Sequence, residues 1–90
     1  MVYWKIKFKS KAEKQLNNLD KQSKQKIQTY LNERILKLNH PKESGKALSP
    51  NKKGLWRYRV DKFRILCKLE ENNLVILVVK IAKRDVVYED

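Results

Sequence analysis

The chain has 90 residues, of which 22 are Lys or Arg and 10 are Asp or Glu, so its formal net charge is +12. A chain of this length buries only about 60–65% of the surface that it exposes when unfolded, which excludes a second lobe. Its 41% hydrophobic residues, with only two Gly and two Pro, argue against global disorder. We therefore expect a single domain over residues 1–90.

The chain shows no sign of a membrane or secreted location. Its single cysteine, Cys67, cannot form an intramolecular disulfide, and no run of 18 apolar residues or secretory leader is visible. We expect a cytoplasmic protein with no membrane partner. With one Cys and one His, the chain has no cluster of soft ligands for zinc, and we expect no metal and no other cofactor.

The positive charge is concentrated in the first part of the chain. Residues 1–54 hold 14 basic and 4 acidic side chains, whereas residues 55–90 hold 8 and 6. Most of the early cations are lysines, which act as mobile point charges. This part is either a solvated surface or a surface that attracts a polyanion such as nucleic acid.

The first 40 residues predict one strand and two helices. Residues 2–8 alternate apolar and polar side chains, as in a half-buried strand. A helix is expected to begin near Ser10, where Ser10 and Glu13 have the spacing of a capping box. A second helix is expected from about residue 21 to residue 39, where His40-Pro41 ends its apolar stripe. The short join between the helices predicts an antiparallel hairpin.

The rest of the chain predicts a polar loop and three strands. Residues 41–54 carry both Gly and both Pro residues and form a loop long enough to have a function. Residues 55–60, 63–70 and 74–81 read as strands in two hairpins, and the last is apolar enough to lie inside the sheet. The fold class is α+β: an N-terminal strand, a helical hairpin and a three-stranded antiparallel meander that together form one sheet.

Three arginines are predicted to share one face of that sheet. Trp56, Tyr58 and Val60 form the apolar side of their strand, so Arg57 and Arg59 point to the opposite side. If Asp61-Lys62 is a two-residue turn, Arg59 lies directly opposite Arg64. Like charges placed so are destabilising, which leaves two interpretations. Either the long side chains lie along an open face with their heads in water, or they form a cradle for phosphate.

The remaining chemistry is limited to a few residue types. His40 stands alone and reads as a helix-end residue, while Cys67 shares a strand face with Phe63 and Ile65 and reads as core. An enzyme built from this chain would rely on Arg, Lys, Tyr and carboxylates. Such a set suffices to cleave RNA, because the 2′-hydroxyl supplies the nucleophile.

The sequence GLWRYRVDKFRIL at residues 54–66, followed by KRDVVY at residues 83–88, resembles the RelE/ParE superfamily of bacterial toxins. The resemblance extends over nearly the whole chain. It implies an α+β fold of the small microbial ribonuclease type and a toxin that is neutralised by a cognate antitoxin. The family's usual Gly-Asp turn is replaced by Asp61-Lys62, and its Gly-His before the last arginine by Ala82-Lys83.

Two branches of this superfamily share the fold. RelE-like toxins cut mRNA in the ribosomal A site, whereas ParE-like toxins inhibit DNA gyrase without a nuclease centre. The basic residues and the C-terminal tyrosine that surround the scissile phosphate in RelE-like enzymes match Arg57, Arg59, Arg64, Arg84 and Tyr88. The resemblance therefore favours a metal-independent mRNA endoribonuclease, with the gyrase inhibitor as the alternative.

The resemblance also implies roles and partners. Tyr88 would act as general base on the 2′-hydroxyl, and Arg84 would act as donor to the leaving 5′-oxygen. Arg57, Arg59 and Arg64 would hold the phosphate. The expected partners are the ribosome with its mRNA and a RelB-like antitoxin with an acidic amphipathic segment. We expect the cations that contact ribosome or RNA to be Lys11, Lys14, Lys21, Lys52, Lys53 and Lys83.

Overall fold

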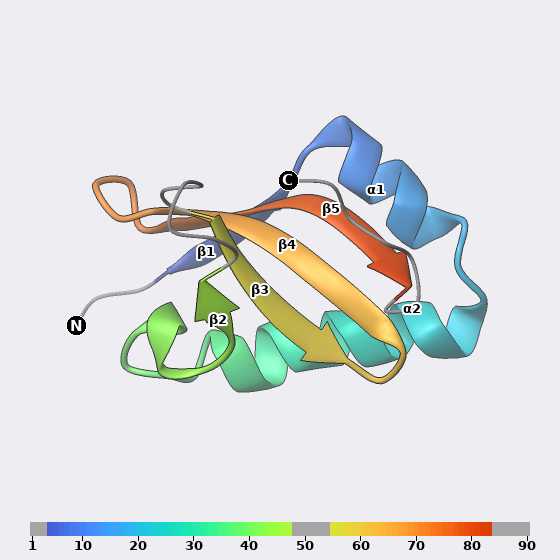
Figure 1. Ribbon diagram of the computed structural model, residues 1–90, viewed down its shortest axis with the longest axis horizontal. Helices are drawn as coiled ribbons and strands as arrows, with labels where there is room; N and C mark the ends of the chain where they lie inside the picture. The colour runs from blue at the N-terminus through green and yellow to red at the C-terminus, as the bar shows by residue number, and fades with distance from the viewer. Residues whose placement is uncertain (1–3, 48–54, 84–90) are drawn as a thin grey trace.

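The structure is a computed structural model that describes residues 4–47 and 55–83. Its elements in chain order are β1 (Lys5–Phe8), α1 (Ser10–Asn17), α2 (Lys21–Thr29), the π-helix η1 (Tyr30–Ile35), the 3-10 helix η2 (Pro41–Glu43), β2 (Lys46–Ala47), β3 (Leu55–Val60), β4 (Phe63–Glu70) and β5 (Val75–Lys83). Figure 1 shows the strands as one twisted sheet, with α2 passing behind them. The predicted α+β class is confirmed.

The five strands follow the order β1-β5-β4-β3-β2. The pairs β5 with β4, β4 with β3 and β3 with β2 are antiparallel, whereas β1 runs parallel to β5. Two parallel strands need a long connection between them, and here the chain from β1 to β5 includes both α-helices. β5 has a neighbour on each side, as its apolar sequence predicts. The two-residue strand β2 was not predicted from the sequence.

Both α-helices bury their apolar stripes against the same face of the sheet. Ala12 and Leu16 come from α1, and Ile27 is followed at four-residue steps by Leu31 and Ile35. The sheet contributes Tyr58, Val60, Phe63, Ile65, Cys67, Leu69, Ile76, Val78 and Ile81 to the same cluster. Burial of this apolar surface is the main force that fixes the helices on the sheet.

The helix ends differ in part from their predictions. α1 begins at Ser10 as expected, but its N-cap is Lys9, and no side chain caps it, so the predicted Ser10-Glu13 capping box is wrong. α2 is capped by Asp20, whose carboxylate accepts a hydrogen bond of 3.2 Å from the main-chain N–H of Ser23. Hydrogen bonds from the side chain of Ser23 and, second, from this main-chain N–H lower the pKa of the Asp20 carboxyl group.

The second helix ends earlier than predicted and changes its winding. From Tyr30 it continues as a π-helix to Ile35, and the N–H of Leu36 bonds to the carbonyl of Leu31 at 3.1 Å. Apolar residues at uniform steps of four drift around an α-helix of 3.6 residues per turn, and the wider turn compensates for that drift. Ile35 is thereby kept in the core.

None of the helices in the described residues has the length and apolar character needed to cross a lipid bilayer.

Candidate nucleic-acid interface on the open face of the sheet

The β3–β4 hairpin has the register that the sequence predicts. Val60 pairs with Phe63, Tyr58 with Ile65, and Arg59 with Arg64. Asp61 in the turn has a φ of 54°, a conformation that Asp tolerates better than most residues. The two arginines therefore lie side by side on the face away from the helices.

A row of paired residues crosses this face from strand to strand. Lys46 of β2 pairs with Arg57 of β3, Arg57 with Leu66 of β4, and Leu66 with Lys80 of β5. Residues directly opposite each other in a sheet share a face, so Arg57 and Lys80 flank the aliphatic Leu66, and Lys46 lies one strand beyond Arg57. The next row on this face holds the Arg59–Arg64 pair. We call the five basic residues of the two rows the cationic face: Lys46, Arg57, Arg59, Arg64 and Lys80.

A β-bulge directs Lys80 to the cationic face. Leu66 pairs with Lys80 and Cys67 with Val78, which leaves Val79 as an extra residue. Strict alternation after Ile76 and Val78 would have placed position 80 in the core. The bulge moves Ile81 into the core instead and turns Lys80 outward. Lys80 was not among the predicted site residues, because nothing in the sequence indicates the bulge.

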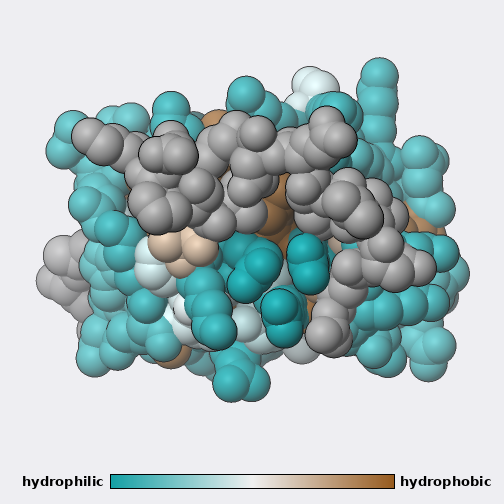
Figure 2. Space-filling view, viewed as in Figure 1, coloured by the Kyte–Doolittle hydropathy of each residue, from teal (hydrophilic) through white to brown (hydrophobic). Residues whose placement is uncertain are grey.

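The arginines differ in how far they are exposed. Arg59 is exposed, whereas Arg57 and Arg64 are half-buried, and the Nε atom of Arg64 is shielded from solvent. In Figure 2, hydrophilic side chains gather over the middle of this side of the molecule, with apolar surface visible between them. Half-buried guanidinium groups bind anions more strongly than fully hydrated ones, and their paired N–H groups match phosphate oxygens.

The other predicted site residues do not all join this face. Lys11 and Lys14 are exposed on α1, and Lys21 is exposed at the start of α2, so all three belong to the helical layer. Lys83 is exposed at the end of β5 and pairs with Phe63, on the side of the core. The remaining predicted residues, Lys52, Lys53, Arg84 and Tyr88, lie outside the described residues.

The segment before β2 is fastened to the sheet by aromatic side chains. Tyr58 donates a hydrogen bond of 2.7 Å to the carbonyl of Pro41, and the indole Nε1 of Trp56 donates one of 2.6 Å to the carbonyl of Ser44. Gly45 has a φ of 77° and lies so close to β3 that a Cβ there would come within 2.7 Å of the Trp56 Nε1. These contacts hold residues 41–45 against one edge of the sheet.

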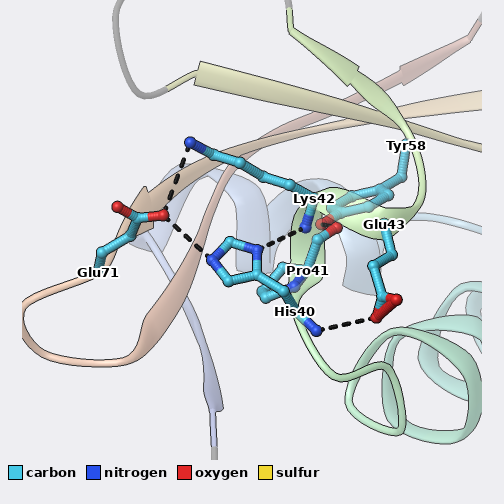
Figure 3. Close-up of polar contacts among 6 residues, drawn as sticks. All are labelled: His40, Pro41, Lys42, Glu43, Tyr58 and Glu71. Atoms are coloured by element: carbon cyan, nitrogen blue, oxygen red, sulfur yellow. Dashed lines mark hydrogen bonds and ion pairs between the residues drawn. The ribbon is translucent and has the colours of Figure 1, made fainter.

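His40 fastens the same segment from its other end (Figure 3). Its Nδ1 accepts a hydrogen bond of 3.1 Å from the main-chain N–H of Lys42, and its main-chain N–H bonds to the Glu43 carboxylate at 3.0 Å. Its Nε2 lies 3.1 Å from the Glu71 carboxylate. The structure thus gives His40 the role of cap for η2, whereas the sequence had suggested the end of the second helix.

Two ionisable groups of the sheet are buried on the helical side. Burial raises the pKa of the Tyr58 hydroxyl and that of the Cys67 thiol. The thiol is fully enclosed, so the predicted core role of Cys67 is confirmed. Neither group serves as a proton acceptor at neutral pH. Among the residues that the structure describes, no group of three or more His, Cys, Asp or Glu is placed to hold a metal ion.

A pocket of about 210 Å³ opens at the β2 edge of the cationic face. It lies between the start of η1, the segment before β2, and β3. Its walls are Tyr30, Ser44, Gly45, Lys46, Arg57 and Arg59. The Tyr30 hydroxyl and the Ser44 hydroxyl lie 3.3 Å apart within it. Tyr30, Ser44 and Lys46 are not predicted as site residues from the sequence, because they come from separate segments that only the fold brings together.

The chain belongs to the ParE toxin family of type II toxin-antitoxin systems, parDE, whose sequence model matches residues 6–88. It is thus a toxin of the RelE/ParE superfamily, as the sequence resemblance indicated. No curated protein sequence matches the chain at a significant level.

Solved structures of RelE toxins have the same fold. A chain of the toxin-antitoxin complex RelBE2 from Mycobacterium tuberculosis superposes with a TM-score of 0.80 and 17% identity, covering 96% of this chain and 97% of that one. The isolated E. coli RelE toxin gives 0.73 and 14% over 96% and 88%. The RelE-RelB complex from Pyrococcus horikoshii gives 0.72 and 18% over 96% and 100%.

Proposed function

We propose that this toxin is a ribosome-dependent endoribonuclease that cleaves mRNA in the ribosomal A site and so inhibits translation. The observation that carries the proposal is the direct pairing of Arg59 with Arg64 beside half-buried Arg57, on the sheet face opposite α1 and α2. Guanidinium groups at such short spacing present several N–H donors side by side, in the paired arrangement that matches the oxygens of a phosphate. A phosphodiester that gains negative charge on its way to a phosphorane offers such oxygens.

The proposed reaction needs no metal ion. The 2′-hydroxyl oxygen attacks the adjacent phosphorus, its proton passes to a base, and the bond to the 5′-oxygen breaks as that oxygen takes up a proton. We assign the base to Tyr88, which matches the C-terminal tyrosine of RelE-like enzymes, and not to Tyr58 of β3, which is buried and has a raised pKa. In this proposal the positive charge of the arginines favours the tyrosinate form of Tyr88. Arg84 stabilises or protonates the leaving oxygen, and Arg57, Arg59 and Arg64 hold the phosphate.

In this proposal the ribosome positions the substrate for the toxin. It holds the mRNA strand in one orientation, and positioning of this kind accounts for much of the barrier in such reactions. The exposed lysines Lys11, Lys14 and Lys21 lie on the helical layer. We assign them, together with Lys52, Lys53 and Lys83, to contacts with the ribosome or its RNA.

A specific observation favours a second candidate function. The sequence model that matches residues 6–88 is that of ParE toxins, and ParE-like toxins inhibit DNA gyrase. The two functions leave different damage in the cell. After a brief induction, mapping of mRNA 5′ ends should show new ends within codons while the chromosome stays intact. Double-strand DNA breaks with intact mRNA would establish gyrase inhibition instead.

A cell-free test examines the cleavage proposal directly. Purified toxin added to ribosomes paused on a defined mRNA should cut it once in the A-site codon, and the cut should persist when EDTA is added with magnesium kept balanced. No cut on the ribosome, or a strict need for an added transition metal, would contradict the proposal.

We further propose that the cognate antitoxin places an acidic segment on or beside the cationic face. The structural relatives from M. tuberculosis and P. horikoshii are toxin-antitoxin complexes. Opposite charges steer such an association, so its affinity should fall as salt rises. An equally tight complex after Arg57, Arg59 and Arg64 are all changed to Ala would show that the antitoxin binds elsewhere.

A further inference from the structure

The pocket at the β2 edge is continuous with the cationic face because the two share Arg57 and Arg59. Neighbouring strands lie about 4.8 Å apart and a strand rises about 3.4 Å per residue, so Lys46 on β2, two strands and two residues from Arg64 on β4, is roughly 12 Å from it, a gap that two long side chains shorten. That distance lies within the reach of neighbouring nucleotides in an extended single strand. An RNA whose scissile phosphate lies at the Arg59-Arg64 pair can thus enter the pocket with the nucleotide beside it.

The pocket has firm walls, which a binding site requires. The Trp56 hydrogen bond to the Ser44 carbonyl fixes one wall, and the close approach of Gly45 to β3 fixes its floor. The ring of Tyr30 packs edge-on against that of Tyr58 at a centroid distance of 6.2 Å. The guanidinium group of Arg34 lies 5.8 Å from the centroid of the Tyr30 ring. Tyr30 is therefore held by its neighbours on two sides.

The lining combines two kinds of chemistry. Lys46 and Arg57, paired across β2 and β3, present positive charge. The hydroxyls of Tyr30 and Ser44, 3.3 Å apart, can each donate and accept a hydrogen bond. A phosphate suits the first pair. A ribose 2′-hydroxyl suits the second pair, because it both donates and accepts hydrogen bonds. An ionised carboxylate of an acidic peptide only accepts them, so it would use the two hydroxyls as donors alone.

The size of the pocket restricts what enters it. Its volume of about 210 Å³ is below that of pockets for drug-sized ligands, about 300–1,000 Å³. It admits a sugar and its phosphate while the base stays outside. The site therefore reads the backbone of one nucleotide, without selecting its base.

We propose that this pocket is a ribonucleotide subsite that binds the ribose and phosphate of the nucleotide next to the cleaved linkage. Lys46 and Arg57 bind its phosphate, and the Tyr30-Ser44 hydroxyl pair binds its 2′-hydroxyl. The proposal rests on the proposed ribonuclease function. It assigns the toxin a means of distinguishing RNA from DNA that is separate from the nucleophile of the reaction.

Equilibrium binding tests the subsite without requiring cleavage. The probes are a fluorescein-labelled hexaribonucleotide and the hexadeoxyribonucleotide of the same sequence, measured by anisotropy at several salt concentrations. Lys46→Ala should weaken binding of both probes by roughly tenfold and reduce the salt slope by about 0.7. The double variant Tyr30→Phe/Ser44→Ala should weaken binding of the RNA alone, so that the RNA-to-DNA affinity ratio falls toward one.

The control is Lys37→Ala, which removes an equal charge from an exposed residue paired with Glu33, away from the pocket. It should leave both affinities within twofold of the parent. Thermal melts of all variants check that each is folded, and Tyr30→Phe keeps the ring that packs on Tyr58.

Three outcomes would overturn the subsite. One is an effect of Lys46→Ala no larger than that of Lys37→Ala. Another is an RNA-to-DNA ratio unchanged in the double variant. The third is displacement of the RNA by a poly-glutamate peptide whose own binding depends on Tyr30 and Ser44, which would make the pocket a site for an acidic partner. If the variants behave as expected but the parent does not cut mRNA on the ribosome, the subsite stands and the proposed cleavage is wrong.

Discussion

Arg59 and Arg64 are direct partners across the β3–β4 hairpin, and both project from the face of the sheet that the α-helices leave open. The pairing follows from a turn of only two residues, with Asp61 in the left-handed region. The turn thus sets the register of the hairpin, and the register brings the two arginines to adjacent positions on one face. Three variants of predicted site residues test what this arrangement does.

Arg64→Ala should slow cleavage far more than it changes stability. Arg64 is half-buried in the centre of the cationic face, where a contact to the developing phosphorane is worth about 3 kcal/mol, or roughly 100-fold in rate. Single-turnover cleavage on saturated ribosomes measures the loss. The matched control is Lys68→Ala, which removes an exposed cation from the same strand and should cleave at the parental rate. Equal rates for the two variants would contradict the role of Arg64.

Tyr88→Phe should separate catalysis from binding. The change removes only a hydroxyl, so binding to the ribosome should be retained while cleavage falls by roughly 100-fold or more, the scale of a lost general base. Co-sedimentation with ribosomes and single-turnover cleavage give the two readouts. Full toxicity and a parental rate would make Tyr88 a bystander, and the base would then have to be sought at Lys83, Asp85 or Glu89.

The combined change of Lys11, Lys14 and Lys21 to Ala should have the reverse effect. These exposed lysines lie on the helical layer, so their loss should weaken ribosome binding and reduce its salt slope by about 0.7 to 0.9 for each phosphate contact removed. The rate on saturated ribosomes should stay near that of the parent. A lower rate with unchanged affinity would place these lysines in the reaction instead.

The sequence predicts those parts of the site that depend on local periodicity. The alternation of Trp56, Tyr58 and Val60 sufficed to place Arg57 and Arg59 on the opposite face, because side chains in a strand alternate by rule. Lys80 could not be predicted, because its direction depends on a bulge in the pairing of β4 with β5 that no local pattern in the sequence indicates. Prediction of the winding of η1 failed for a similar reason: tertiary packing, not helix propensity, decides how Ile35 reaches the core.

Raising the pH should destabilise the protein through Tyr58. Burial raises the pKa of its hydroxyl, so the folded protein keeps this proton at a pH where the unfolded chain, with a tyrosine pKa of about 10, has lost it. The contribution to stability is complete below about pH 10 and is lost as the pH rises further. Tyr58→Phe should cost about 1 kcal/mol near neutrality, for the hydrogen bond to Pro41, but its stability should decline less steeply in alkali.

Urea unfolding at a series of pH values from about 8 to 11 measures both effects. Cys67, whose thiol pKa is also raised by burial, is present in the parent and the variant, so its own alkaline contribution cancels in the comparison. Parallel declines for the two proteins would show that the Tyr58 hydroxyl does not couple to folding.

Gly45 should be the position before β2 that is least tolerant of a side chain. Its φ of 77° costs an ordinary residue about 1–2 kcal/mol, and a Cβ would also meet the Arg57 carbonyl oxygen, the Trp56 Nε1 and the Tyr58 Cδ1, the last at 2.8 Å. Relief requires this segment to move off β3, which breaks the Trp56 hydrogen bond to Ser44 and opens the pocket. We therefore expect Gly45→Ala to lower the free energy of unfolding by about 2–3 kcal/mol.

The variant Gly45→Asn distinguishes the backbone conformation from the crowding as the cause, because Asn tolerates the conformation but its Cβ meets the same atoms. It should be as destabilising as Gly45→Ala, while Ala47→Gly, an exposed change in β2, should cost less than about 1 kcal/mol. A urea midpoint for Gly45→Asn close to that of the parent would mean that the backbone conformation, and not the contact with β3, sets the requirement for glycine.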